Sequence, residues 1–231
     1  MAALNRAVTG TSASTTVFTN GTGSSPGLGS STTSLDSKLV HQAKSEIRSL
    51  AAEIAALASQ DIPPQSFFDG FLPRLKVAMG ASAAAVWQLR TTLSEEQSDA
   101  SQKQAITLTA SHALPPALGQ EDSAEYEQHQ SVLRTVLAES KPILVPPQTV
   151  HLDAERPTNP LDEALVLVPV AVQDQPEYLL EVIQSAAGGP TAQRGYLRFV
   201  AQMADLLGDY LRRQRLREAS NELARQRRVE S

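Results

Sequence analysis

Residues 164–185 constrain the fold of this chain more than any other stretch. They read ALVLVPVAV, QDQPE and YLLEVIQS, so two strongly apolar runs flank a short polar segment with a proline. Two such runs are typical of a β-hairpin joined by a loop of several residues. Because nearly every position of both runs is apolar, both faces of these strands should be covered. The pattern therefore predicts a central sheet with helices on one side and other elements on the opposite side.

Composition excludes several classes of protein. Hydrophobic residues make up 41% of the 231 residues and the net charge is -5, so we expect a well-sized core and no nucleic-acid partner. The chain has no cysteine, which excludes disulfides and thiolate chemistry and suits a cytoplasmic location. Neither a membrane-spanning apolar run nor a secretory signal pattern is found in the sequence.

Three regions are expected along the chain. Residues 1–38 are mostly Ser, Thr, Gly and Ala, and so little apolar surface cannot offset the entropy of ordering, which predicts a disordered tail. A globular domain is expected over residues 39–218. A charged helical extension is expected over residues 219–231.

Two helices with matching apolar seams are expected at opposite ends of this domain. The first covers about residues 39–59, and the last begins near Thr191. Apolar residues recur at alternating intervals of three and four in both, as in a coiled-coil seam. Such a seam packs on its own domain or on a second copy of the chain, and the sequence leaves these two alternatives open. The residues expected at a homodimer interface are Val40, Ile47, Leu50, Ile54, Leu57, Val200, Leu207 and Leu211.

The middle of the chain alternates helical and strand patterns. A second helix, with a kink or break near Leu72 caused by Pro73, is followed by two strands, a third helix and a short strand. The expected ranges are, in that order, residues 65–79, 83–90, 104–111, 121–139 and 143–145. A long loop over residues 148–162 precedes the hairpin, and loops of this length are often functional or mobile.

This order of elements resembles a GAF domain, as do the phrases MGASAAAVWQLR, ITLTASHALP, LVLVPVAV and YLLEVIQS. The resemblance covers residues 39–218. It implies a GAF/PAS-like α+β fold, with an antiparallel sheet of about six strands and the N- and C-terminal helices on one face. It also implies that the third helix and the long loops cover the other face, where GAF proteins bind small molecules, and that dimers form through the first and last helices.

A narrower resemblance rests on IPPQSFFDGFLPRL, TNPLDEALVLVPV and GPTAQRGYLRFVAQMADLLGDYL. These stretches are similar to the N-terminal GAF region of bacterial hemolysin-D-like membrane-fusion (adaptor) proteins. The resemblance implies an alternative function, in which the chain is the cytoplasmic part of a secretion or efflux adaptor and acts as a protein–protein interaction scaffold.

The sequence contains no recognisable catalytic constellation. His41, His112, His129 and His151 have no histidine or carboxylate at metal-ligand spacing, so each is expected at a surface or an interface, and neither a metal nor a cofactor is expected. Phosphate-binding glycine motifs and a nucleophile elbow are also missing. Among GAF-specific sites, the cyclic-nucleotide signature is not present. Bilin attachment and methionine-sulfoxide reduction both need cysteine, so both are excluded for this chain.

A small-ligand pocket is expected around Trp87, the only tryptophan, because Ala83 and Ala85 on the same strand leave room over that face. The alternative is that Trp87 is simply a core residue. The expected pocket residues are Trp87, Thr107, Thr109, Tyr126 and Gln130, with Ile106 and Leu108 in place of the threonines if the strand register differs.

The function expected from these observations is a non-enzymatic sensory and dimerisation module. Its expected partners are a second copy of the chain and a small-molecule ligand. The arginine-rich end of the last helix is either a solvated helix tip or a contact for an acidic protein partner. These arginines are Arg212, Arg213, Arg215, Arg217, Arg225, Arg227 and Arg228.

Overall fold

The computed structural model describes residues 31–92, 103–148, 158–173, 175–185 and 189–229. The chain divides into two units, Met1–Val40 and His41–Ser231, and the sheet belongs to the second. Most of the expected tail, residues 1–30, lies outside the described residues. Helix α1 (Ser31–Ser59) begins before residue 39, because a formed helix extends through poor helix formers at little cost per residue.

The sheet has five antiparallel strands in the order β2-β1-β5-β4-β3, close to the six or so expected. The expected hairpin is confirmed as its centre, with β4 paired to β5 along their length. The strands are β1 (Ala83–Thr92), β2 (Lys103–His112), β3 (Ile143–Val145), β4 (Ala164–Val172) and β5 (Gln175–Gln184).

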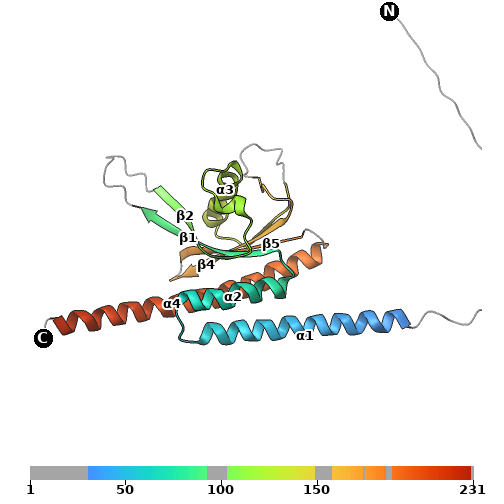
Figure 1. The fold of residues 1–231 in the computed structure, drawn as a ribbon, viewed down its shortest axis with the longest axis horizontal. Coiled ribbons are helices and arrows are strands. Elements are labelled where there is room, and N and C mark those ends of the chain that lie inside the picture. Colours follow the sequence, from blue (N-terminus) through green and yellow to red (C-terminus); the bar gives the residue numbers. More distant parts are fainter. Residues whose placement is uncertain (1–30, 93–102, 149–157, 174, 186–188, 230–231) are drawn as a thin grey trace, which may run out of the picture. The chain divides into compact units, whose positions relative to one another are not determined.

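Helices cover both faces of this sheet within residues 41–231, as Figure 1 shows. Helix α3 (Ala124–Glu139) lies on one face, after the short 3-10 helix η1 (Pro116–Gly119). Helices α2 (Pro64–Met79) and α4 (Pro190–Val229) cover the other face. The part of α1 from His41 onward packs on α2 and α4 as an outer layer. The predicted α+β architecture, with the first and last helices on one side, is therefore confirmed.

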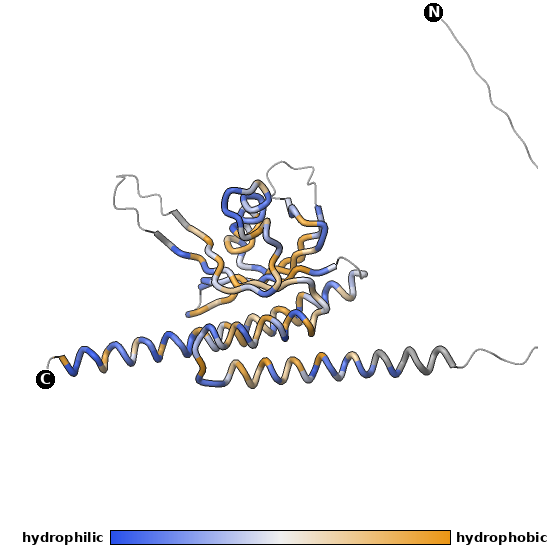
Figure 2. Tube along the Cα trace, viewed as in Figure 1, coloured by the Kyte–Doolittle hydropathy of each residue, from blue (hydrophilic) through white to orange (hydrophobic). Residues whose placement is uncertain are grey.

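The two faces of the sheet give two hydrophobic cores. Alternate residues of β4 point to opposite sides, so Val166 and Val168 join the core under α2 and α4, whereas Leu165 and Leu167 join the core under α3. Figure 2 shows mainly hydrophobic residues along the middle of the sheet. None of the described helices is both long and apolar enough to cross a membrane.

Helix α2 continues through Pro73, so of the kink or break expected near Leu72 the break does not occur. It ends at Gly80, whose φ of 60° is left-handed. The Ala81 N–H then donates to the Lys76 carbonyl at 2.9 Å, a helix end that glycine makes easily because it has no Cβ.

Candidate functional site

Trp87 belongs to a buried polar cluster under α3. Its indole Nε1 donates to the Glu181 Oε2 atom at 2.6 Å, and the other Glu181 oxygen lies 2.6 Å from His129 Nε2. Glu181 and His129 are both 0% exposed, and the Trp87 and His129 ring centres are 5.2 Å apart. A buried carboxylate is tolerated only when it is paired and hydrogen-bonded. The cluster therefore joins β1, β5 and α3 through one carboxylate.

The prediction that His129 lies at a surface or interface is wrong. The sequence places no carboxylate near it, but the fold brings Glu181 across from a position 52 residues away. A signal was present in β5, where Glu181 stands among Leu179, Leu180, Val182 and Ile183. An acidic residue in a strand covered on both faces has to be buried, and it therefore needs a buried partner.

The strand register decides which side chains accompany Trp87. Leu108 pairs with Trp87 and Ile106 pairs with Leu89, so Ile106 and Leu108 share the face of Trp87. Thr107 pairs with Gln88 and therefore lies on the opposite face. Thr109 is exposed at a bulge between the two registers. Neither predicted threonine borders the tryptophan, and the alternative pair does.

The two helix residues of the expected pocket lie on α3. Tyr126 is half-buried against the core, and burial raises the pKa of its hydroxyl above 10.0. Gln130 is 2% exposed, and its Nε2 atom has no hydrogen-bond partner, nor does His129 Nδ1. Trp87 is itself 1% exposed with its N–H engaged. The structure therefore has a packed polar core at Trp87. Among the described residues, no group of three or more Asp, Glu, His or Cys could hold a metal.

The residues expected at a dimer interface separate into three groups. Ile54, Val200, Leu207 and Leu211 are buried in the core beneath the sheet, so the chain's own fold uses them and the expectation that they form an interface seam is corrected. Leu50 and Leu57 are half-buried, and Ile47 is 38% exposed. The side chain of Val40 lies outside the described residues.

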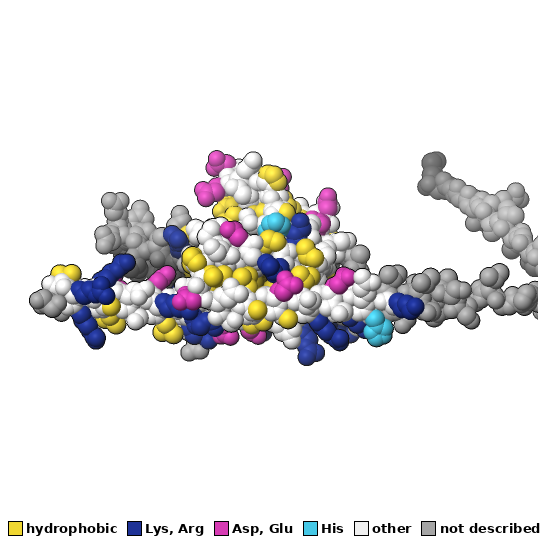
Figure 3. Space-filling view, turned by 60° about the horizontal axis from the view of Figure 1, so that its bottom comes forward, with side chains coloured by type: hydrophobic (Ala, Val, Ile, Leu, Met, Phe, Trp, Pro, Cys, Tyr) yellow, Lys and Arg dark blue, Asp and Glu magenta, His cyan; other side chains and the backbone are white. Residues whose placement is uncertain are grey.

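An apolar groove of about 650 Å³ runs beside Ile47, between the helices of the covering layer. Val77 at its edge is 67% exposed. Figure 3 shows hydrophobic side chains on this side of the molecule among acidic and basic ones. The groove is lined by Ala43, Glu46, Ile47 and Leu50 of α1, Val77, Ala78, Met79 and Gly80 at the end of α2, and Ala192, Gly195, Tyr196 and Phe199 of α4.

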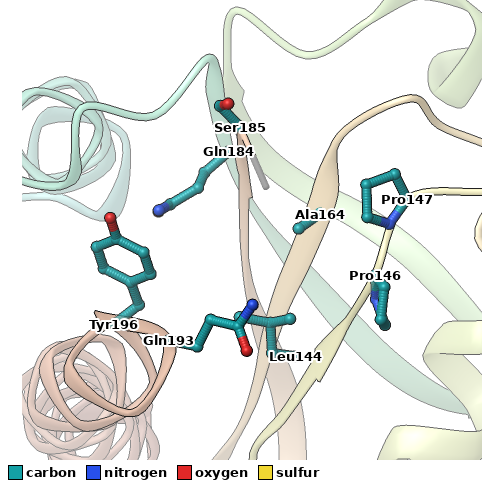
Figure 4. Close-up of a pocket in the computed structure, with 8 residues that line it drawn as sticks. All are labelled: Leu144, Pro146, Pro147, Ala164, Gln184, Ser185, Gln193 and Tyr196. Carbon is teal, nitrogen blue, oxygen red and sulfur yellow. The ribbon is translucent and has the colours of Figure 1, made fainter. Parts of the chain in front are cut away.

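A smaller cavity of about 30 Å³ lies where the sheet edge meets the first turns of α4. Gln184, the last residue of β5, is 4% exposed, and its Oε1 atom has no hydrogen-bond partner. Figure 4 shows its side chain extending toward Tyr196. Tyr196 also lines the larger groove. The lining residues are Leu144, Pro146, Pro147, Ala164, Gln184, Ser185, Gln193 and Tyr196. Sequence reasoning missed this cavity, since nothing in the local pattern singles out Gln184.

Several arginines of the expected acidic-partner site are occupied within the chain. Arg215 forms a two-point ion pair with Glu177, Arg217 pairs with Asp61, and Arg213 donates to the Ala58 carbonyl at the end of α1. Tyr210 and Gln214 also donate to the Ile62 carbonyl, at 2.8 and 2.7 Å. This part of α4 therefore clamps the connection between α1 and α2. Arg225 and Arg227 lie beyond it on exposed turns.

Comparison with known proteins gives similarity at the level of structure only. No family model and no curated protein match the chain. The A. aeolicus nlh2 GAF domain in an inactive state has a TM-score of 0.51 at 12% identity, over 74% of this chain and 99% of that domain. The GAF domain of a Coxiella burnetii phosphoenolpyruvate-protein phosphotransferase has a TM-score of 0.49 at 15% identity, over 77% and 96%. The first of these likenesses shows that the chain has a GAF fold. The narrower adaptor resemblance has no counterpart in these matches.

Proposed function

We propose that this chain is a non-enzymatic sensory module that works as a homodimer, with the groove between α1, α2 and α4 as its self-association surface. The observation that carries the proposal is the exposure of Ile47 and Val77 at the edges of an apolar groove. Exposed apolar surface of this kind is typical of interaction sites. The GAF fold supports a sensory role, since the similar A. aeolicus domain has a described inactive state.

A second copy of the chain is the proposed occupant because the groove contains both an exposed apolar side chain and residues with little or no side chain. In a two-fold pair, the same patch must supply both a projection and a recess. Val77 projects from the end of α2, whereas Ala192 and Gly195 leave a shallow recess along α4. Gly195 has no atom within 4 Å of where a Cβ would stand.

Catalysis is not part of the proposal, because the buried acid–base pair found among the described residues, His129 with Glu181, is fully enclosed by protein. Arg225 and Arg227 remain candidates for contact with an acidic partner. The resemblance of three stretches to adaptor proteins is compatible with such a module acting as a scaffold, and no contact between the described residues favours that role separately.

Sedimentation at micromolar concentration tests the dimer with the Val77→Glu variant. Val77 is largely exposed in one chain, so the variant should fold normally, and the glutamate would be an unpaired buried charge in the dimer. We expect a dimer for the unchanged chain and a monomer for the variant. Leu108→Glu on β2 is a matched control, because Leu108 is 41% exposed and lies away from the groove. A monomeric unchanged chain would overturn the proposed dimer.

A further inference from the structure

The exposed end of α4 carries a short apolar stripe with an arginine at each end. Leu216 and Leu223 are 61% and 56% exposed, and a spacing of seven residues places them on one line along the helix. Arg212 stands four residues before the first leucine and Arg227 four residues after the second, and both are exposed on the same line. We call these four residues the Arg–Leu stripe. Figure 3 shows hydrophobic and Lys or Arg side chains together at this end of α4.

Most of the stripe lies beyond the part of α4 that the rest of the chain holds. Arg217 pairs with Asp61, and every side chain from Glu218 to Val229 is exposed. A helical segment of about twelve residues is marginally stable in water on its own, so a partner that covers its leucines would also stabilise it. The groove proposed for the dimer is lined by α4 residues only as far as Phe199, about 25 Å along the helix before Leu216.

The order of charges disfavours a second copy of the chain on this stripe. The spacings of four, seven and four residues read the same in both directions. Two parallel copies that pair both leucines bring each arginine onto its own counterpart, and two antiparallel copies bring Arg212 onto Arg227. Like charges that face each other across an interface oppose pairing. The stripe therefore suits an occupant of opposite charge.

We propose that the Arg–Leu stripe is a docking site for an amphipathic helix of an acidic partner protein. This helix would carry two apolar residues that cover the leucines and a carboxylate opposite each arginine. Arg212 already donates to Asp209 at 2.9 Å at the surface, and its other N–H groups stay available for a second carboxylate. The inference rests on the acidic contact proposed above for Arg227 and specifies its form.

An anionic membrane fits this part of α4 less well than an acidic helix does. Helices that lie on membranes present a broad apolar face with basic residues beside it. Here the apolar line is narrow, and Glu218 and Glu222 are exposed on the same segment, where anionic lipid would repel them.

Two synthetic helical peptides test the proposed docking on the full chain. Both carry leucines seven residues apart, and four residues outside each leucine one peptide has glutamate and the other has lysine. Fluorescence anisotropy of the labelled peptides gives the dissociation constants at low and high salt. We expect the acidic peptide to bind about tenfold more tightly than the basic one at low salt, the effect of two exposed charge pairs. This preference should shrink at high salt because exposed charges are screened.

Three variants assign the binding to the stripe. Leu223→Ser removes half of the apolar line, and Arg227→Glu inverts the charge at one end, so each should weaken binding of the acidic peptide about fivefold or more. Arg225→Glu is the matched control, because Arg225 is also exposed but lies on the opposite side of the helix, and it should change binding by less than about twofold. Circular dichroism checks that each variant keeps its helices.

Several results would overturn the proposal. They are equal binding of the two peptides, no binding of either at millimolar concentration, and equal weakening by Arg225→Glu and Arg227→Glu. Adsorption of the chain to vesicles of an anionic phospholipid without a preference for the acidic peptide would assign the stripe to a membrane surface instead. Val77→Glu in the groove should leave peptide binding unchanged, so failure of the proposed dimer and failure of the docking site appear in different measurements.

Discussion

At the scale of single residues, Glu181 is the side chain on which the buried polar contacts under α3 converge. It accepts from Trp87 and pairs with His129, and all three side chains are nearly or fully buried. Removing one partner of a buried hydrogen bond leaves the other group unsatisfied, which typically lowers stability by about 1 to 3 kcal/mol.

We therefore expect Glu181→Leu to lower the free energy of unfolding in urea titrations by about 1 to 3 kcal/mol for each group that it leaves unsatisfied, the His129 and Trp87 nitrogens. The double variant His129→Leu with Glu181→Leu should lose less than the sum of the two single losses, since the two side chains act as a pair. Glu222→Leu on an exposed turn of α4 is the control and should change stability by less than about 0.5 kcal/mol. Strictly additive losses would show that the pair is not coupled.

Tyr210 gives a second prediction at this scale, and it concerns pH. Its hydroxyl donates to the Ile62 carbonyl, its ring stacks on Phe67, and burial raises its pKa above 10.0. The unfolded chain loses this proton near pH 10, whereas the folded chain keeps it to higher pH. The stabilisation is thus complete below pH 10 and declines as pH rises toward the folded-state pKa.

Replacing Tyr210 with phenylalanine keeps the ring and removes the hydroxyl. We expect a loss of about 1 kcal/mol at neutral pH from the missing hydrogen bonds. We also expect a shallower fall of stability above pH 10 than in the unchanged chain. Urea titrations at several pH values between 8 and about 11 measure both effects, and an unchanged slope above pH 10 would contradict the role given to this hydroxyl.

Contacts of single side chains are also the features that the sequence predicted least well. Trp87 was singled out correctly as a buried or pocket residue, but its true neighbours depend on a strand bulge at Thr109 and on a partner 94 residues away. The unpaired Gln184 oxygen depends on a helix packing against a sheet edge. Contacts of this kind arise between distant segments, so no local periodicity contains them.

At the scale of elements, α4 shows why an apolar seam did not reveal its partner. Val200, Leu207 and Leu211 recur at helical spacing and pack against the sheet of their own chain. The same spacing serves a helix dimer equally well, because ridge-into-groove packing requires only a continuous apolar face. Gly208 favours packing on the sheet over packing on a second helix, because its missing side chain lets α4 come close to the backbone of β4.

Gly208→Ala should therefore be destabilising. A Cβ at this position would stand 2.9 Å from the Ala171 carbonyl oxygen, so α4 would have to move off the sheet, at about 1 to 3 kcal/mol. Gly195→Ala on the same helix is the matched control, compared at a protein concentration at which the chain is monomeric, because Gly195 also lines the groove. A Cβ added at Gly195 would have no atom within 4 Å. The free energy of unfolding of this variant should therefore rise by up to about 1 kcal/mol, from the higher helix propensity of alanine. Chemical unfolding of both variants makes the comparison, and equal effects would contradict the close approach at Gly208.

At the scale of the whole molecule, the order of elements and the pairing of the central hairpin were predictable, because apolar period and length decide them. The strongly apolar runs at residues 164–172 and 178–184 could be stable only inside a covered sheet. The placement of α1 outside α2 and α4 was not predictable, since its seam fits a helix layer as well as a sheet. The clamp that holds it depends on Arg213, Gln214 and Arg217, which read in sequence as a charged helix tip.

The length of α4 supports a last prediction, which separates the groove from the helix end as the dimer surface. Beyond Arg217, the described side chains are exposed, and Leu223 is 56% exposed there. A chain ending after Arg217 keeps Tyr210, Gln214 and the groove, so its stability should fall by less than about 0.5 kcal/mol, and it should remain a dimer in sedimentation. A chain ending after Asp209 loses Tyr210, Leu211 and the clamp, and it should be strongly destabilised. If the first truncation is folded but monomeric, the dimer surface is the exposed end of α4 and the groove is excluded as its principal contact.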